Sequence, residues 1–245
     1  MEFTGKVALI TGAAVGIGRA TALLMAQQGA KLILLDIDGE KLESVKAEVA
    51  LPVENILTYT CDISDEARVN EVVADALNHF GKIDILVNNA ALWRSFTKFV
   101  DTPVDAWRKY FDINVIGTVC VTKAVLPSMI GQNYGRIINL GSVAGVYGNG
   151  SMAHYSATKG AIIAFTKSLA KEVAEHNILV NTVSPGTVSP AEISDIDYTE
   201  PSAMSYFGRT GSDRENAELI CFLASDRAGY LSGQNIQIDG VRKKL

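Results

Sequence analysis

The sequence predicts an α/β fold in which a doubly wound, parallel sheet of about seven strands is flanked by helices. Three observations support this prediction. Short apolar runs alternate with longer amphipathic stretches along the whole chain. The first apolar run leads directly into a glycine-rich turn and then into a helix. No linker, repeat or low-complexity segment interrupts the alternation, so we expect a single domain that covers residues 1–245.

The expected strands are short and almost entirely apolar, which is typical of strands buried on both faces of a parallel sheet. They lie at 7–11, 32–35, 56–60, 83–87, 136–140, 178–183 and 235–239. Between them, the helical pattern covers 20–28, 39–50, 64–80, 104–130, 155–176 and 214–224. Gly29, Pro52 and Gly81 each follow one of these helices and mark its end. The periodicity lapses at about 186–210, which indicates a substrate lid.

The turn after the first strand has the composition of a phosphate-binding loop. Gly12 permits a tight turn, and Gly16 and Gly18 let the backbone approach a pyrophosphate at the N-terminus of the following helix. The spacing is Gly-x-x-x-Gly-x-Gly, and a glycine trio alone is often only a turn. The interpretation of this turn as a phosphate-binding loop therefore needs support from a motif in the next strand.

Asp36 supplies that support, because it ends the second expected strand at the offset where an acidic residue binds the adenine-side ribose. A carboxylate there repels a 2′-phosphate, and neither Val15 nor Ile37 offers a positive charge to hold one. The sequence therefore predicts NAD in preference to NADP.

Several polar residues stand at strand ends or inside apolar stretches. Asp62 follows the third strand, where it can cap a helix or touch the adenine amine. Asn88 and Asn89 follow the fourth strand and satisfy either buried backbone groups or cofactor edges. Asn114 lies in the middle of an apolar helix, as either a satisfied core amide or a bend that carries water. The intervening loop, 92–100, is rich in aromatic residues and is expected to cover a site.

Tyr155 and Lys159 are four residues apart in the expected helix, so their side chains share one face. A neighbouring ammonium favours the ionised form of a phenol, whose pKa is ordinarily about 10. Ser142 follows the fifth strand and is placed to hold a substrate oxygen against that phenol. Together they predict a proton-transfer site, although a Tyr–Lys pair at this spacing is by itself usually a solvated surface pair.

Composition excludes several other classes of protein. The formal net charge of −5 and the absence of a long basic block argue against a nucleic-acid partner. Cys61, Cys120 and Cys221 are far apart and show no metal-ligand spacing, so we expect reduced core thiols and no metal site. We find neither a signal-peptide pattern nor an apolar run long enough to span a bilayer. The expectation is a cytoplasmic protein without a membrane partner.

With these motifs in order, the sequence resembles the short-chain dehydrogenase/reductase family over essentially the whole chain. The resemblance rests on Thr11–Gly18, Asp62, Asn88–Ala90, Asn114, Ser142, Tyr155, Lys159, Pro185–Thr187 and Ile238–Gly240. It implies a Rossmann-type fold and hydride transfer between NAD and a secondary alcohol or ketone. The cofactor residues it implies are Gly12, Gly16, Ile17, Gly18, Asp36, Asp62, Ile63, Asn89, Ala90, Tyr155, Lys159, Pro185, Gly186 and Thr187.

The resemblance also assigns roles to four catalytic residues. Tyr155, as a phenolate, takes the proton of the substrate hydroxyl. Ser142 positions the substrate oxygen and stabilises its developing charge. Lys159 lowers the pKa of Tyr155 and binds the nicotinamide ribose, and Asn114 holds a water that links Lys159 to solvent. Two positions depart from the family pattern, since Ala91 and Val241 stand where glycine is common.

The substrate is less constrained than the reaction. Trp93, Val143, Tyr147, His154 and Tyr206 are candidate pocket residues beside Ser142, and they favour a cyclic or apolar substrate such as a hydroxysteroid. His154 is the one among them that we expect merely to pack the loop.

Alternative functions remain open at this point. The acidic lid, with Glu192, Asp195, Asp197 and Glu200, disfavours an acyl-carrier-protein or coenzyme A thioester, so a 3-oxoacyl reductase is a secondary candidate. Serines in the expected lid can bind substrate hydroxyl groups, so a sugar or polyol dehydrogenase also remains a candidate. A non-catalytic NAD-binding regulator is the alternative of another class. The resemblance further implies a homotetramer joined through apolar positions such as Val115 and Val119.

Overall fold

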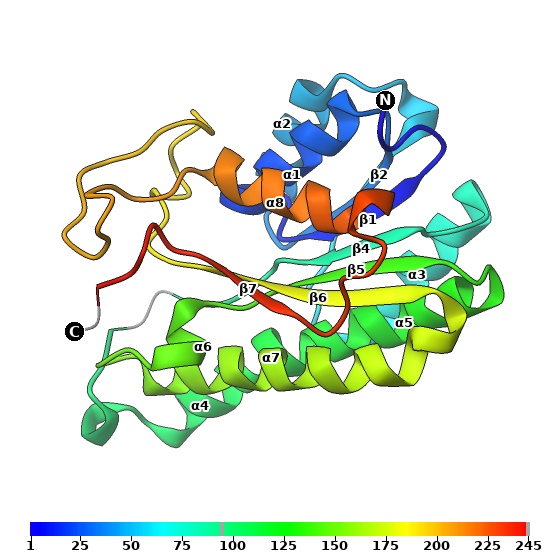
Figure 1. Cartoon of the computed structure of the whole chain (residues 1–245). Coiled ribbons are helices and arrows are strands. Elements are labelled where there is room, and N and C mark those ends of the chain that lie inside the picture. The colour runs from blue at the N-terminus through cyan, green and yellow to red at the C-terminus, as the bar shows by residue number, and fades with distance from the viewer. Residues whose placement is uncertain (94–95, 244–245) are drawn as a thin grey trace.

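The computed structural model describes residues 1–93 and 96–243, and they form one parallel, seven-stranded sheet with helices on both faces (Figure 1). The strands are β1 Val7–Thr11, β2 Lys31–Asp36, β3 Ile56–Thr60, β4 Ile85–Asn88, β5 Gly135–Leu140, β6 Ile178–Pro185 and β7 Asn235–Ile238. The helices are α1 Gly16–Gln27, α2 Gly39–Val49, α3 Glu66–Phe80, α4 Val104–Phe111, α5 Thr118–Gly131, α6 Val143–Tyr147, α7 Ala153–Val173 and α8 Asp213–Ala224. Short 3₁₀ turns lie at Val53–Asn55, Phe99–Asp101, Ala174–His176 and Asp226–Ala228.

The strand order is β3-β2-β1-β4-β5-β6-β7, with each neighbouring pair parallel. The chain therefore builds outward from β1 in one direction and then returns to build from β4 in the other. The crevice between the carboxyl ends of β1 and β4 is the point where ligands bind in such sheets. The α/β class and the parallel sheet are as the sequence predicted.

Alternation along each strand divides the core into two layers. Ile10 and Leu34 face α1, α2 and α8, whereas Leu9 and Leu35, one residue away, face α3, α5 and α7. Figure 1 shows these two sets of helices on opposite faces of the sheet. Because both faces are covered, the strands must be apolar at nearly every position, which is why they read as continuous apolar runs.

Element boundaries differ from the expected ones for local reasons. Helix α1 begins at Gly16, four residues before the start predicted from the sequence. The prediction missed the first turn because it contains Gly16 and Gly18, and glycine is a poor helix former. The expected helix at 104–130 is interrupted by a π-helical segment, Asp112–Gly117, which holds Asn114. A π-helical bulge of this kind is one of the recognised causes of a bend and often marks a functional site. The short helix α6 was not expected.

The stretch Val104–Gly131 is long and apolar enough to meet a length-and-composition criterion for a membrane span, contrary to the sequence expectation. Its two helices pack against α3 and α7 in the layer beneath the sheet. Core helices of globular proteins meet the same criterion. We interpret this stretch as a core helix pair, and Val115 and Val119 on it are only partly exposed.

The expected lid between β6 and α8 is irregular, and the C-terminal segment pairs with it. The Tyr206 N–H donates to the Val241 carbonyl at 2.9 Å, and the Lys243 N–H donates to the Met204 carbonyl at 2.9 Å. Val241 is 58% exposed and adopts a φ of +58°, in the left-handed region. A β-branched residue is strained there, whereas the glycine that the family resemblance implies at this position would not be.

We expect Val241→Gly to raise the free energy of unfolding by about 1 kcal/mol, because relief of the strained φ exceeds the extra chain entropy of glycine. Chemical denaturation followed by circular dichroism measures the difference. Val104→Gly is the control, since Val104 is also exposed but begins a helix, and its replacement should lower stability by a similar amount. A less stable Val241→Gly variant would contradict the strain argument.

Candidate active site

A cavity of about 880 Å³ opens at the carboxyl ends of the strands and collects most of the predicted site residues. Residues from the turn after β1, from β2 and from the loop after β3 line one end, and residues from β5, α6 and α7 line the other. The predicted residues that line it are Gly12, Gly16, Ile17, Asp36, Asp62, Ile63, Asn89, Ala90, Trp93, Ser142, Val143, Tyr155, Lys159, Pro185, Gly186 and Thr187. Ala91, the first departure from the family pattern, also lines it.

The glycine turn is pressed against the end of β4. A Cβ on Gly18 would lie 2.0 Å from the Gly12 carbonyl oxygen, and one on Gly12 would lie 2.8 Å from the Cα of Ala90. Asn89 fastens this contact, because its Nδ2 donates to the carbonyl oxygens of Thr11 and Gly12 at 3.1 and 2.9 Å. Gly18 therefore acts beneath the turn and is not itself part of the cavity wall.

The N-terminus of α1 is left open for an anion. Its N-cap, Val15, has no capping side chain, and its first turn contains no acidic residue. The first backbone N–H groups of a helix otherwise need an acceptor, and the helix dipole favours a negative one. The donor set therefore fits the pyrophosphate of a dinucleotide.

The carboxylate of Asp36 is held at the end of β2. Its two oxygens accept hydrogen bonds from the backbone N–H groups of Ala14 and Asp38 at 2.9 and 3.0 Å. Ile37 beside it is 72% exposed. Among the described residues up to Ile63 that line the cavity, none is a lysine or arginine. Arg19 and Lys41 line a neighbouring pocket, where they pair with Glu48 and Asp38. Asp62 forms a local turn by accepting from the N–H and hydroxyl of Ser64.

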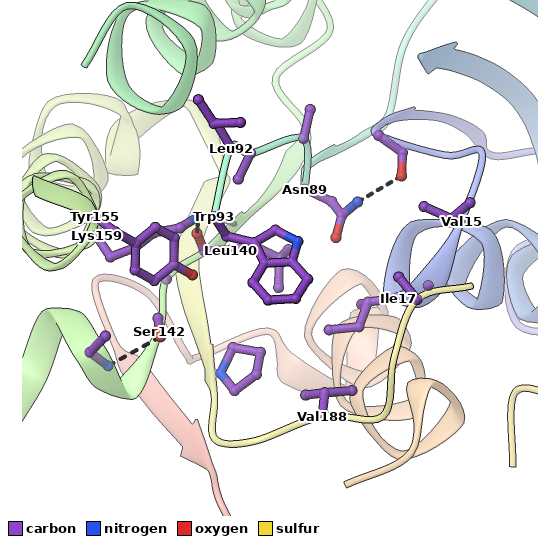
Figure 2. Close-up of a pocket in the computed structure, with 18 of the residues that line it drawn as sticks. Val15, Ile17, Asn89, Leu92, Trp93, Leu140, Ser142, Tyr155, Lys159 and Val188 are labelled. Carbon is purple, nitrogen blue, oxygen red and sulfur yellow. Dashed lines mark hydrogen bonds between the residues drawn. The ribbon is translucent and has the colours of Figure 1, made fainter. Parts of the chain in front are cut away.

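Ser142, Tyr155 and Lys159 meet at the other end of the cavity (Figure 2). Ser142 caps α6, and its Oγ accepts from the Ala144 N–H at 3.1 Å, which leaves the hydroxyl proton for another acceptor. The Lys159 Nζ donates to the carbonyl oxygen of Leu140 at 2.7 Å and lies 5.8 Å from the centroid of the Tyr155 ring. Figure 2 also shows the Trp93 indole pointing into the cavity.

Burial dominates the electrostatics of this group. It raises the pKa of Tyr155 to about 12, with the Ser142 hydrogen bond opposing the shift and Tyr110 adding to it. Burial also lowers the pKa of Lys159 to about 8. The expectation that Lys159 depresses the pKa of Tyr155 is therefore not met in the protein alone. Near neutral pH, Tyr155 is a neutral phenol, ready to donate a proton.

The side chain of Asn114 connects two walls of the site. Its Nδ2 donates to the Leu92 carbonyl at 2.9 Å and to the Thr158 hydroxyl at 3.1 Å, and its Oδ1 accepts from the Leu92 N–H at 2.7 Å. Both amide hydrogens are thus used, so a relay water can be held only by Oδ1 or by the backbone carbonyl. The relay remains a prediction, whereas the core-amide interpretation is the one that the contacts support.

Three predicted pocket residues lie away from the cavity wall. His154 is fully buried and packs edge-on against the ring of Tyr110 at 4.3 Å. Tyr147 and Tyr206 are exposed, and Lys243 covers the Tyr206 ring. None of these three lines the cavity, so the expected substrate set reduces to Trp93, Val143 and Ser142.

Other lining residues were not anticipated. They include Lys109, Ile113, Asn149, Met152, Met204, Asp213 and Arg242. Asn149 and Met152 lie between Ser142 and Tyr155 in the sequence, and this position could have been used to predict that they line the cavity. Arg242 is brought in by pairing of the C-terminal segment with the lid, which no sequence pattern reveals.

Comparison with known proteins agrees with this geometry. A family profile described as short chain dehydrogenase matches residues 6–199. The chain is 41% identical over 243 residues to the 3-oxoacyl-[acyl-carrier-protein] reductase FabG of Thermotoga maritima, with 98% of each sequence covered.

Solved structures are also similar to this chain over nearly its whole length. An NAD⁺-bound xylitol dehydrogenase superposes with a TM-score of 0.88 at 36% identity, covering 98% of this chain and 100% of that one. A levodione reductase superposes with a TM-score of 0.87 at 33% identity, covering 97% of each chain.

Proposed function

Because the chain belongs to the short-chain dehydrogenase/reductase family, we propose that it is an NAD(H)-dependent oxidoreductase that interconverts a secondary alcohol and a ketone. The observation that carries the proposal is the convergence of Ser142, Tyr155 and Lys159 on the cavity that the glycine turn also lines. Bound NAD(H) supplies the hydride acceptor or donor. The protein supplies orientation and proton transfer.

In the reductive direction, the Tyr155 phenol gives its proton to the carbonyl oxygen as hydride reaches the carbon. The Ser142 hydroxyl donates to the same oxygen and holds it in place. The buried Lys159 ammonium stabilises the phenolate that remains. In the oxidative direction the same phenolate takes the proton of the alcohol.

The choice of NAD follows from Asp36. Its carboxylate is fixed by two backbone N–H groups, so it cannot swing away from a ribose bound beside it. Repulsion of a 2′-phosphate by this carboxylate, without a compensating cation, favours NAD over NADP.

For the substrate, we propose a small cyclic or polyhydroxylated secondary alcohol. The similarity to xylitol dehydrogenase and levodione reductase supports this class. Neither those proteins nor the Thermotoga maritima reductase is named for a hydroxysteroid. Two of the aromatic side chains that suggested one, Tyr147 and Tyr206, lie outside the cavity, and Trp93 remains.

The second candidate is reduction of a 3-oxoacyl thioester, which the identity to the Thermotoga maritima reductase favours. One feature of the cavity agrees with it. Lys109 and Arg242 line the wall, and neither forms an ion pair with a residue that the structure describes. Two such cations suit the phosphates of a thioester carrier better than they suit a neutral alcohol. A regulator that only binds NAD has no use for a phenol, Tyr155, beside the buried ammonium of Lys159 on the cavity wall.

Tyr155→Phe should reduce turnover by about 10³-fold, because general acid and base catalysis is lost while the ring remains. NADH binding, followed by fluorescence, should stay nearly unchanged. Tyr147→Phe is the matched control, since that exposed tyrosine lies outside the cavity and its replacement should leave turnover intact. Full activity in Tyr155→Phe would refute the mechanism.

Asp36→Asn should narrow the preference for NAD⁺ over NADP⁺ by about tenfold, because it removes the charge that repels the 2′-phosphate but keeps the side-chain shape. The ratio of kcat/KM for the two cofactors measures it. Glu40→Gln, an exposed change on α2, is the control. A wild-type protein that prefers NADP⁺ would overturn the cofactor proposal.

A substrate panel separates the two candidates. Wild-type protein should oxidise cyclic alcohols or pentitols with NAD⁺ faster than it reduces a 3-oxoacyl coenzyme A with NADH. Arg242→Met should raise KM about fivefold for the thioester only, since a lost ion pair affects the charged substrate alone. Activity with the thioester alone would identify 3-oxoacyl thioester reduction as the function. A lack of activity with every substrate, although NAD⁺ binds, would favour a regulator.

A further inference from the structure

Asp213 is a buried carboxyl on the wall of the cofactor cavity. It is the first residue of α8 and is only 4% exposed. It lines the same cavity as the glycine turn, and its Oδ1 would lie 3.8 Å from a Cβ placed on Gly16. Since Gly16 begins α1, this carboxyl stands beside the helix N-terminus that fits a pyrophosphate.

The carboxylate of Asp213 accepts no hydrogen bond from any residue that the structure describes. The cap of its own helix is made by other groups, because the Ser212 Oγ accepts from the Glu215 N–H and Glu215 accepts from the Ser212 N–H. A carboxyl that is nine-tenths buried without a hydrogen-bond partner is costly when ionised. Its polar atoms point to a ligand that is not part of the chain.

The charged groups around Asp213 do little to neutralise it. Arg19 on α1 is the cation that lowers the pKa of Asp213, but its guanidinium binds Glu48 on α2 and the Ser194 carbonyl in the lid segment. On α8 itself, Arg214 pairs with Asp197 and Glu215 pairs with Arg209. Burial accordingly raises the pKa of the Asp213 carboxyl to about 6, with Arg19 opposing the shift.

We propose that Asp213 is a cofactor-binding residue that acts in its protonated form, taking up a proton when the dinucleotide binds and donating a hydrogen bond to its pyrophosphate. The inference rests on the proposed function, because it assumes that a dinucleotide occupies the glycine turn. An ionised carboxyl beside a pyrophosphate would be a buried like-charge contact, whereas a neutral one is a donor of suitable chemistry. The incoming negative charge raises the pKa of the carboxyl further.

The sign of the pH effect follows from linkage. The protonated form binds, so affinity is fully present below the pKa of the free protein and is lost as pH rises toward the pKa of the complex. The dissociation constant of NAD⁺ should therefore increase by up to about tenfold per pH unit above pH 7. This dependence concerns binding and does not require turnover.

Calorimetric titration of the whole protein with NAD⁺ near pH 7.5, in phosphate and in Tris, gives the number of protons taken up directly. We expect close to one proton for wild-type protein and none for Asp213→Asn, whose amide can still donate to a phosphate. The dissociation constant of Asp213→Asn should be independent of pH between about 6 and 8.5. Glu218→Gln, on the exposed face of the same helix, should behave like wild type.

Other outcomes overturn the proposal. Proton uptake near zero in wild-type protein, with NAD⁺ still bound, contradicts it even if Asp213→Asn fails to fold. Uptake that persists in Asp213→Asn assigns the proton to another group. Binding that requires added Mg²⁺ would mean that the carboxylate stays ionised and shares a cation with the pyrophosphate. Absence of NAD⁺ binding in every variant and in wild type refutes the proposed function instead.

Discussion

The close contact between the glycine turn and the end of β4 is the constraint on which the site depends. A Cβ on Gly12 would collide with Ala90, and one on Gly18 would collide with the Gly12 carbonyl. Asn89 ties the turn to the end of β4 through two hydrogen bonds. This contact opens the N-terminus of α1 toward the crevice at the reversal of strand order. The place and direction of the α1 N-terminus, which fits a pyrophosphate, thus follow from the positions of β1 and β4.

At the Tyr155–Lys159 end of the cavity, desolvation makes the charged forms of two side chains unfavourable. Lys159 is buried and Tyr155 is partly buried, and desolvation shifts both pKa values toward the neutral forms. Among the described residues, only Leu140, at the end of β5, accepts a hydrogen bond from the ammonium, through its carbonyl oxygen. Strained or costly groups at a site of chemistry are common where the surrounding structure holds them in place. Here the rigid element is the long helix α7, anchored under the sheet.

The sequence was sufficient to predict the fold and the gathering of Ser142, Tyr155 and Lys159 on one cavity, and the reason is physical. A parallel sheet covered on both faces produces apolar runs and brings all strand ends to one edge, so Gly12, Asp36, Asn89 and Ser142 could be assembled without coordinates. The substrate wall could not be assembled in this way. Its members depend on how irregular segments fold back, which has no periodic signal, so Tyr147 and Tyr206 were misplaced and Arg242 was missed.

The pairing of the C-terminal segment with the lid has a practical consequence. Residues 204–207 and 240–243 are held together by backbone hydrogen bonds, so the segment predicted to be a substrate lid is tethered to the C-terminal segment. A peptide fused after Leu245 would load this tether, whereas one fused before Met1, which is 89% exposed beside α1 and α8, would not (Figure 1). The terminus chosen for a fusion should therefore affect the kinetics of this protein, and substrate affinity is the quantity that we expect to change most.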